Sequence, residues 1–246
     1  MRLQLRAELY KLRTTRAVVG VLAAMVALVT LAVLLHCSGL SLGRLTSRGD
    51  QRAVFVDVGV NLGAVFAGLV GALSITSEIR SGTIRPTLLV TPRRGRVIAA
   101  KAVSTFVTGF GLGAIAAGTA GAVGSIALAG RGVAVQVSAG DYLLLILGGG
   151  AGAALWAVIG LGLGAVVRAQ VPTVVALFAW LLFVENLFGD LPSAHRFVPG
   201  ALAQALAGQR RDGTLHAPAL AAALLALYAV VALLAGRMLT IRRDIG

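Results

Sequence analysis

The residues of this sequence that are suited to binding are concentrated in one basic segment. Residues 77–97 contain five arginines, two prolines and two glycines, together with an apolar strip formed by Ile84, Leu88 and Leu89. A threonine would cap a short amphipathic helix here and Pro92 would end it. Arginines beside an apolar strip favour docking on another protein, because a solvated basic loop would not need the apolar side chains.

Three polar residues lie inside otherwise apolar stretches: Asp57, Asn61 and Glu185. Asp57 and Asn61 are four positions apart and share one face of a helix. A carboxylate in hydrocarbon costs about 3 kcal/mol or more, so such residues line a polar path, relay protons or sit where water reaches them. For Asp57 we favour a hydrated position near a membrane surface. For Glu185 we favour a structural pairing, with Arg196 as the candidate partner. A proton relay is disfavoured, because no acid is expected at mid-depth with a partner.

The sequence offers little for catalysis within the chain. Cys37 is the single cysteine, so neither an intrachain disulfide nor a cysteine metal site is expected. The glycine-rich run 148–152 lacks a following Gly-Lys-Ser/Thr and is not a phosphate loop. We therefore expect a protein that is not an enzyme and that holds no cofactor of its own.

Glycines recur four positions apart within the apolar stretches. The pairs are Gly109/Gly113, Gly148/Gly152 and Gly160/Gly164, and further glycines lie nearby. Small residues at this spacing let helices approach closely in a membrane. An Ala- and Gly-rich composition also produces such pairs by chance, so the sequence predicts close packing without saying which pairs matter.

The composition decides what class of protein must position these residues. Of 246 residues, 58% are hydrophobic and 13% are charged, with a formal net charge of +13; the mean hydropathy is +0.91 and the pI about 11.6. So much apolar surface cannot be buried in one globule of this size, which excludes a soluble enzyme and a disordered basic protein. It also argues against nucleic acid as the partner that the high pI would otherwise suggest.

Stretches without charged residues predict an all-α polytopic membrane protein, a single transmembrane domain over residues 1–246. A helix needs about 20 apolar residues to cross ~30 Å of hydrocarbon, and only helices suit runs this long. We predict six transmembrane helices, near residues 17–39, 54–77, 98–128, 141–167, 171–189 and 217–238.

The basic residues predict the orientation. With these boundaries, fifteen of the 22 lysines and arginines fall on one side of the membrane and seven on the other. The excess of basic residues on the cytoplasmic side of membrane proteins places both termini and the 78–101 connection in the cytoplasm. The expected location is the cell membrane.

Two further segments are expected at the membrane surface. In residues 1–16, Leu5, Leu9 and Leu12 share one face, as in an interfacial helix with cations near anionic lipid; an ordinary basic flank is the alternative. Residues 189–216 are too apolar for a free loop; a surface-lying segment is one expectation, and short re-entrant or interfacial helices are the other, which the family resemblance described next implies.

Three places in the chain resemble the permease subunits of type-2 ABC transporters, the small six-span exporter class. Residues 8–16 look like that family's Glu-Leu-x-Lys-Leu-Arg-Thr-x-Arg entry to the first span. The stretch from Glu78 to Lys101 is similar to its Glu-[Phe/Tyr]-Arg-x-Gly-Thr…Thr-Pro-x-Arg…Lys signature, with Ile79 in place of the aromatic residue. Glu185 with the outer segment 191–200 is the third place.

The resemblance implies that the 78–96 connection contains a coupling helix that seats in a groove of a separate cytoplasmic ATPase. Two permeases, as a homo- or heterodimer, would form the substrate pathway, and ATP and Mg would bind only to the ATPase subunits. Basic residues would pair with acidic groups on the ATPase. The candidate coupling residues are Glu78, Arg80, Thr83, Ile84, Arg85, Leu88, Arg93 and Arg94.

Other readings remain open at this point. Glu78 and Arg80 would alternatively pair with each other at the membrane edge. An ion-gradient-driven secondary transporter would be expected to carry inverted repeats and mid-membrane carboxylates, which we do not find in the sequence. A non-transporting scaffold or sensor would be expected to carry an extended interaction tail or a folded extramembrane domain.

Overall fold

The computed structural model describes residues 16–39, 45–82, 94–189, 191–209 and 215–242, and within these ranges all regular structure is helical. The long helices are α2 (Arg16–Gly39), α3 (Arg48–Arg80), α5 (Arg94–Gly130), α6 (Ala139–Val167) and α11 (Pro218–Arg242). Between α6 and α11 the chain forms α7 (Gln170–Ala179), the π-helix η2 (Trp180–Val184), α8 (Glu185–Gly189), α9 (Pro192–His195) and α10 (Pro199–Leu206).

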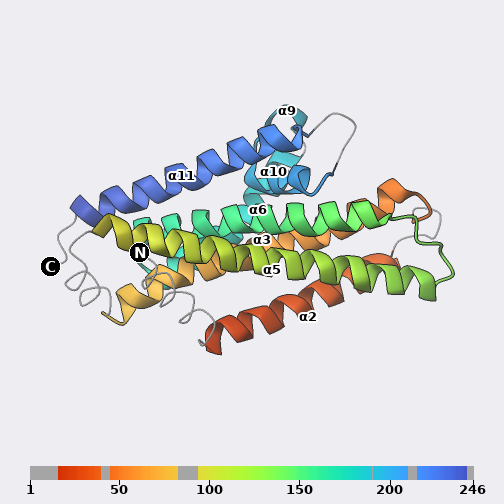
Figure 1. The fold of residues 1–246 in the computed structure, drawn as a ribbon, viewed down its shortest axis with the longest axis horizontal. Coiled ribbons are helices and arrows are strands. Elements are labelled where there is room, and N and C mark those ends of the chain that lie inside the picture. The colour runs from red at the N-terminus through yellow and green to blue at the C-terminus, as the bar shows by residue number, and fades with distance from the viewer. Residues whose placement is uncertain (1–15, 40–44, 83–93, 190, 210–214, 243–246) are drawn as a thin grey trace.

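α6 is the central helix of a bundle. It packs against α3, α5 and α11, while α2 lies along α3 and α5 (Figure 1). In the most apolar stretch of each helix, 72% of the residues of α3 and 61% of those of α6 are buried, against 17% in α2 and 22% in α11. α3 and α6 therefore form the core, and α2 and α11 present most of their apolar surface to the outside.

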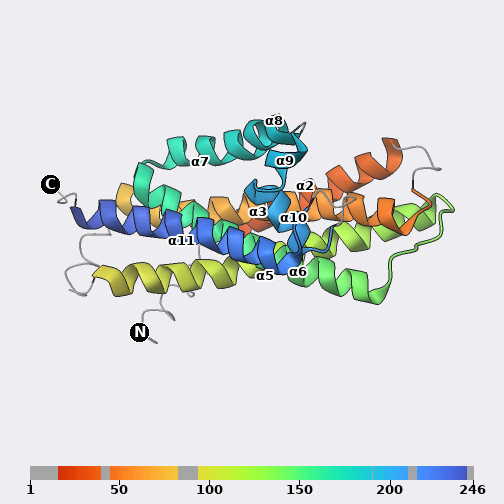
Figure 2. The same ribbon diagram turned by 90° about the horizontal axis from the view of Figure 1, so that it is seen from above.

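The helices α2, α3, α5 and α6 alternate in direction and α11 runs the same way as α6, so their ends gather in two places (Figure 1). We call the first place the Asp141 end; it holds the last residues of α2 and α5 and the first residues of α3 and α6. The second, the Glu78 end, holds the last residues of α3, α6 and α11 and the first residues of α2 and α5. α7 and α8 lie on the opposite side of the bundle from α5 (Figure 2).

Five of the described helices are long and apolar enough to cross a membrane: Val18–Gly39, Arg48–Arg80, Val97–Gly130, Ala139–Val167 and Pro218–Leu239. They correspond to five of the six predicted spans, and the prediction of an all-helical chain is confirmed. The remaining predicted span, 171–189, is built from α7, η2 and α8 in direct succession, and its longest α-helical piece has 10 residues. The coarse conclusion is a multi-pass, all-helical membrane protein.

Helix caps explain why α3 and α6 begin before their predicted spans. The Ser47 side chain accepts a hydrogen bond from the Asp50 N–H and caps α3. Ser138 and Asp141 form a capping box at the start of α6. Such caps satisfy N–H groups that the first turn leaves free, and they fix a helix start regardless of hydropathy.

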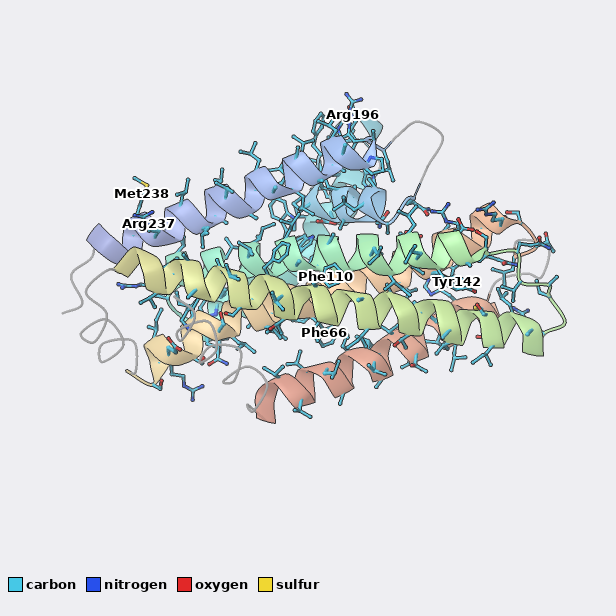
Figure 3. The ribbon with its side chains drawn as sticks, viewed as in Figure 1. Phe66, Phe110, Tyr142, Arg196, Arg237 and Met238 are labelled. Atoms are coloured by element: carbon cyan, nitrogen blue, oxygen red, sulfur yellow. The ribbon has the colours of Figure 1, made fainter. Side chains whose placement is uncertain are left out.

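Close backbone contact confirms the predicted glycine packing and identifies the glycines that take part. A Cβ atom at Gly160 would lie 2.0 Å from the Gly68 carbonyl oxygen on α3, and one at Gly113 would lie 2.4 Å from Ala153 Cβ on α6. All six predicted glycines have such a neighbour within 3.0 Å. By contrast, Gly111 faces open space. Phe66 of α3 packs in an apolar cluster with side chains of α2 and α5 (Figure 3).

The region between α8 and α11 contains short helices, as predicted for residues 189–216. α9 has 4 residues and α10 has 8, and each begins with proline. α10 is buried against α6 and α11, so it belongs to the bundle and does not lie on it as a loose connection. The predicted interfacial helix over residues 1–16 lies, apart from Arg16, outside the described residues.

Candidate functional site

The Glu78 end of the bundle contains a buried ion pair. Lys101 Nζ of α5 lies 2.8 Å from Glu78 Oε1 of α3, and it also donates to the Ser74 carbonyl oxygen at 3.2 Å. The two charged side chains are only 3% and 13% exposed. A charge this deeply buried needs its partner, since removing one member leaves the other uncompensated. The pair therefore ties the last turn of α3 to the first turns of α5.

Arg80 forms a different contact from the one considered in the sequence analysis. Its Nη1 donates to Gln170 Oε1 at the start of α7, at 3.4 Å, so Arg80 links α3 to α7. The helix ends immediately after it, with Ser81 donating its N–H to the Ser77 carbonyl oxygen. Gly82 then takes a φ of +71°, in the left-handed region that favours glycine.

Most of the candidate coupling residues lie in the connection between α3 and α5. Glu78 and Arg80 are described, and Arg94 is the first residue of α5. The other candidates, Thr83, Ile84, Arg85, Leu88 and Arg93, lie outside the described residues. The structure thus describes the two helices that flank the docking segment and the ion pair that joins them.

One polar residue predicted within the membrane, Asn61, contacts the short helix α10. Asn61 Oδ1 accepts a hydrogen bond from Gln204 Nε2 of α10 at 3.1 Å. Asp57 lies one turn earlier on α3 and is partly buried. Gln204 itself is 7% exposed, and its Oε1 has no hydrogen-bond partner among the described residues. The predicted polar face of α3 is therefore used, at least through Asn61, to hold α10.

Glu185 is held by backbone and indole donors, where the sequence analysis favoured Arg196. Its Oε1 accepts from the Gly200 N–H at 2.8 Å and from Trp180 Nε1 at 3.2 Å. The contact needs a glycine, because a Cβ at position 200 would lie 1.8 Å from Glu185 Oε2. Arg196 instead lies over the Phe197 ring, 5.1 Å from its centroid, beside the start of α11 (Figure 3). The described partners of Glu185 are thus Gly200 and Trp180, while the predicted partner Arg196 contacts Phe197.

A second charged cluster lies at the Asp141 end, and sequence reasoning missed it. Arg48 Nε donates to Asp141 Oδ2 at 2.7 Å and Arg48 Nη2 donates to Oδ1 at 2.9 Å. Arg52 Nη1 lies 3.4 Å from Oδ1, while its Nη2 donates to the Gly208 carbonyl oxygen at 2.7 Å. One carboxylate therefore joins α3 and α6, and Arg52 extends the network to the end of α10.

Buried Gln51 completes the connections at this end. Its Nε2 donates to the carbonyl oxygens of Leu45 and Ala134, at 2.8 and 2.9 Å, and its Oε1 accepts from the Gln136 N–H at 2.8 Å. The side chain is 0% exposed. Arg131 also donates to the Cys37 carbonyl oxygen at the end of α2. The only sequence signals for this cluster were the Arg48/Arg52 spacing of four and the Ser138-x-x-Asp141 capping pattern.

The contacts described above join neighbouring helices and loops of the bundle. Within the described ranges, no group of three or more His, Cys, Asp and Glu side chains is placed to hold a metal ion. No protein-family model matches the chain, and no curated protein matches it either. The likeness to type-2 ABC permeases accordingly depends on the sequence motifs alone.

Proposed function

We propose that this chain is the membrane-spanning permease subunit of an ATP-driven type-2 ABC exporter. In this proposal α7, η2 and α8 together make the fifth of six spans, both termini and the Glu78 end are cytoplasmic, and two permease copies form the substrate pathway in the cell membrane. A separate ATPase subunit binds ATP and Mg and docks on the connection between α3 and α5.

The ion pair between Glu78 and Lys101 carries the proposal. It joins the first and last residues of the stretch that resembles the type-2 ABC signature, which are 23 positions apart in this chain, at the two ends of the proposed docking segment. A force applied to that segment would reach α3 and α5 together, because the buried pair couples their ends. α3 packs in turn along α6, at the centre of the bundle.

The test is co-purification with an ATPase encoded next to this protein. The triple variant Arg80→Glu, Arg85→Glu and Arg94→Glu reverses the charge of the docking segment. We expect it to lose the ATPase during purification and to lose stimulation of ATP hydrolysis. The matched control reverses three arginines predicted on the opposite side: Arg44→Glu, Arg196→Glu and Arg211→Glu.

Both variants are first checked for membrane yield and for a single peak in gel filtration. If the docking-segment variant assembles and stimulates hydrolysis as the wild type does, the coupling assignment is wrong. If the wild-type chain binds no ATPase and moves its substrate only with an ion gradient, the protein is a secondary transporter. A chain that binds partners without any transport would be a scaffold or sensor.

A further inference from the structure

The charged cluster at the Asp141 end borders a cavity of about 570 Å³ between α3, α6, α10 and α11. Arg48, Arg52, Gln209 and His216 contribute its polar wall, and Leu144 and Leu215 are among its apolar residues. Among the described residues that line it, none is acidic. We propose that this cavity binds a phosphate group, such as the one in a phospholipid head.

The cluster of Arg48, Arg52 and Asp141 contains one more basic side chain than acidic side chains. Two arginines face a single carboxylate, Asp141, whose Oδ1 already receives both guanidinium groups. Its Oδ2 accepts from Arg48 Nε and from Ser138, and its side chain is 6% exposed. Among the described residues, Asp141 is thus the one carboxylate that contacts the two arginines, and both arginines lie on the wall of the cavity.

Arg48 has donors available for a ligand. Its Nε and Nη2 bind Asp141, which leaves Nη1 without an acceptor among the described residues. Its side chain is 58% exposed although the carboxylate that it binds is buried. A guanidinium group held in place by one carboxylate is pre-organised to bind a second anion, since its planar donors match a phosphate or carboxylate.

Two further features favour an anion in this cavity. α11 begins at Pro218, on the cavity wall, and the first-turn N–H groups of a helix attract negative charge. His216 Nε2 is buried with no hydrogen-bond partner among the described residues. In the proposed topology the spans formed by α3, α6 and α11 begin near this cavity, at the depth of the lipid heads on the non-cytoplasmic side. Basic pockets between membrane helices bind anionic lipid heads on the cytoplasmic side of membranes, and this cavity would offer the same chemistry at the opposite surface.

The inference goes beyond the proposed function, and it is tested with the chain alone. The purified full-length protein, washed free of lipid in an uncharged detergent, is titrated with dihexanoyl phosphatidylglycerol and, separately, with inorganic phosphate. Dihexanoyl phosphatidylcholine is the zwitterionic comparison. Isothermal titration calorimetry gives the dissociation constants. We expect the anionic lipid to bind at least about tenfold more tightly than the zwitterionic one.

Two variants remove the site by independent routes. Arg48→Gln takes away one of the two arginine charges, and Ala217→Trp fills the cavity while retaining both arginines. Each should weaken binding of dihexanoyl phosphatidylglycerol about tenfold or more. Arg196→Gln, which removes an arginine of the same region outside the cavity, should bind as the wild type does. If Arg48→Gln fails to fold, Ala217→Trp still decides the question.

The two titrations also separate the sources of the phosphate. Competition by inorganic phosphate would support a site for the phosphate group from either source, and binding of the lipid alone would support a lipid-head site. The inference is wrong if neither compound binds, if the two lipids bind equally, or if Ala217→Trp leaves binding unchanged. None of these outcomes depends on an ATPase, so failure here is distinct from failure of the exporter proposal.

Discussion

α3 is anchored by a carboxylate at each end, and the two anchors differ in what surrounds them. At the Glu78 end, one lysine and one glutamate form a pair that is almost entirely buried. At the Asp141 end, a buried carboxylate is shared by two arginines, one of them largely exposed. The buried pair joins two helices, whereas the arginine network joins α3, α6 and α10 and lies beside the contacts of Gln51.

The difference teaches that the two ends are stabilised by different kinds of interaction. The Glu78 end depends strongly on one desolvated pair, next to the connection proposed to receive the ATPase. The Asp141 end depends on many hydrogen bonds to loops and backbone, so the loss of any one of them removes a smaller part of the stabilisation. We therefore expect a single substitution at the Glu78 end to lower the stability strongly. Successive substitutions at the Asp141 end should each lower it by a smaller amount.

The largest effect is expected from Lys101→Met. The substitution leaves Glu78 buried without its lysine, which typically costs about 3–5 kcal/mol. Thermal unfolding of the purified protein should show the loss of stability. Hydrogen exchange should rise in residues 74–82 and 97–105 and stay unchanged in residues 45–52. The double variant Glu78→Gln with Lys101→Met should recover much of the loss, and a single variant as stable as the wild type would contradict the role of the pair.

Gln51→Leu is the corresponding change at the Asp141 end. It removes three hydrogen bonds. The Leu45 carbonyl is left buried without this partner, whereas the backbone groups of Ala134 and Gln136 belong to exposed residues and can reach water. We expect a cost of about 2–3 kcal/mol, close to that of one buried unsatisfied group. Here hydrogen exchange should rise in residues 45–52 and 133–138. Exposed Gln136→Leu keeps its backbone N–H and serves as the control, with little change expected.

Gly208→Ala tests the contact between Arg52 and the end of α10. Gly208 has a φ of +80°, and a Cβ there would lie 2.6 Å from Arg52 Nη2 and 2.3 Å from Leu144 Cδ2. Backbone strain of this kind costs about 1–3 kcal/mol. A fall in the midpoint of thermal unfolding would show it. Gly132→Ala, with a φ of +73° and open space around it, separates strain alone from strain combined with the clash.

The smallest effect is expected from Arg80→Ala. Its hydrogen bond to Gln170 is long and exposed, and such surface contacts contribute about 0–1 kcal/mol. The unfolding midpoint should therefore barely move, although the variant removes one of the proposed docking charges. A large loss of stability would mean that Arg80 holds α7 more firmly than its geometry indicates.

The sequence allowed the long helices to be predicted, because hydropathy and helix length are local properties. The helices α3 and α6 begin before the predicted spans, since the caps at Ser47 and Ser138 include polar residues that a hydropathy criterion discards. The 171–189 span was predicted as one helix, but it contains a π-helical turn over Trp180–Val184. Glu185, the next residue, accepts a hydrogen bond from the Gly200 N–H of α10, a contact that is not visible in a local pattern.

The charged sites were predictable only in part, for the same physical reason. Glu78 and Lys101 were both noted as motif residues, yet their pairing depends on how α3 and α5 pack. Arg48 and Asp141 are 93 positions apart, and nothing local relates them. Among the glycines, 109 and 113 face α6 while 111 faces away, a distinction that only the rotation of α5 about its axis decides.

The glycine contacts of α6 have a consequence for the route that a transported molecule would take. Where Gly71 and Gly160 bring the backbones of α3 and α6 together, and where Gly113 does so for α5 and α6, the helices touch without side chains between them. An aqueous channel along these seams would require the main chains to separate. A conduit built from this protein would therefore run over the outside of the bundle, along a wall shared with another molecule.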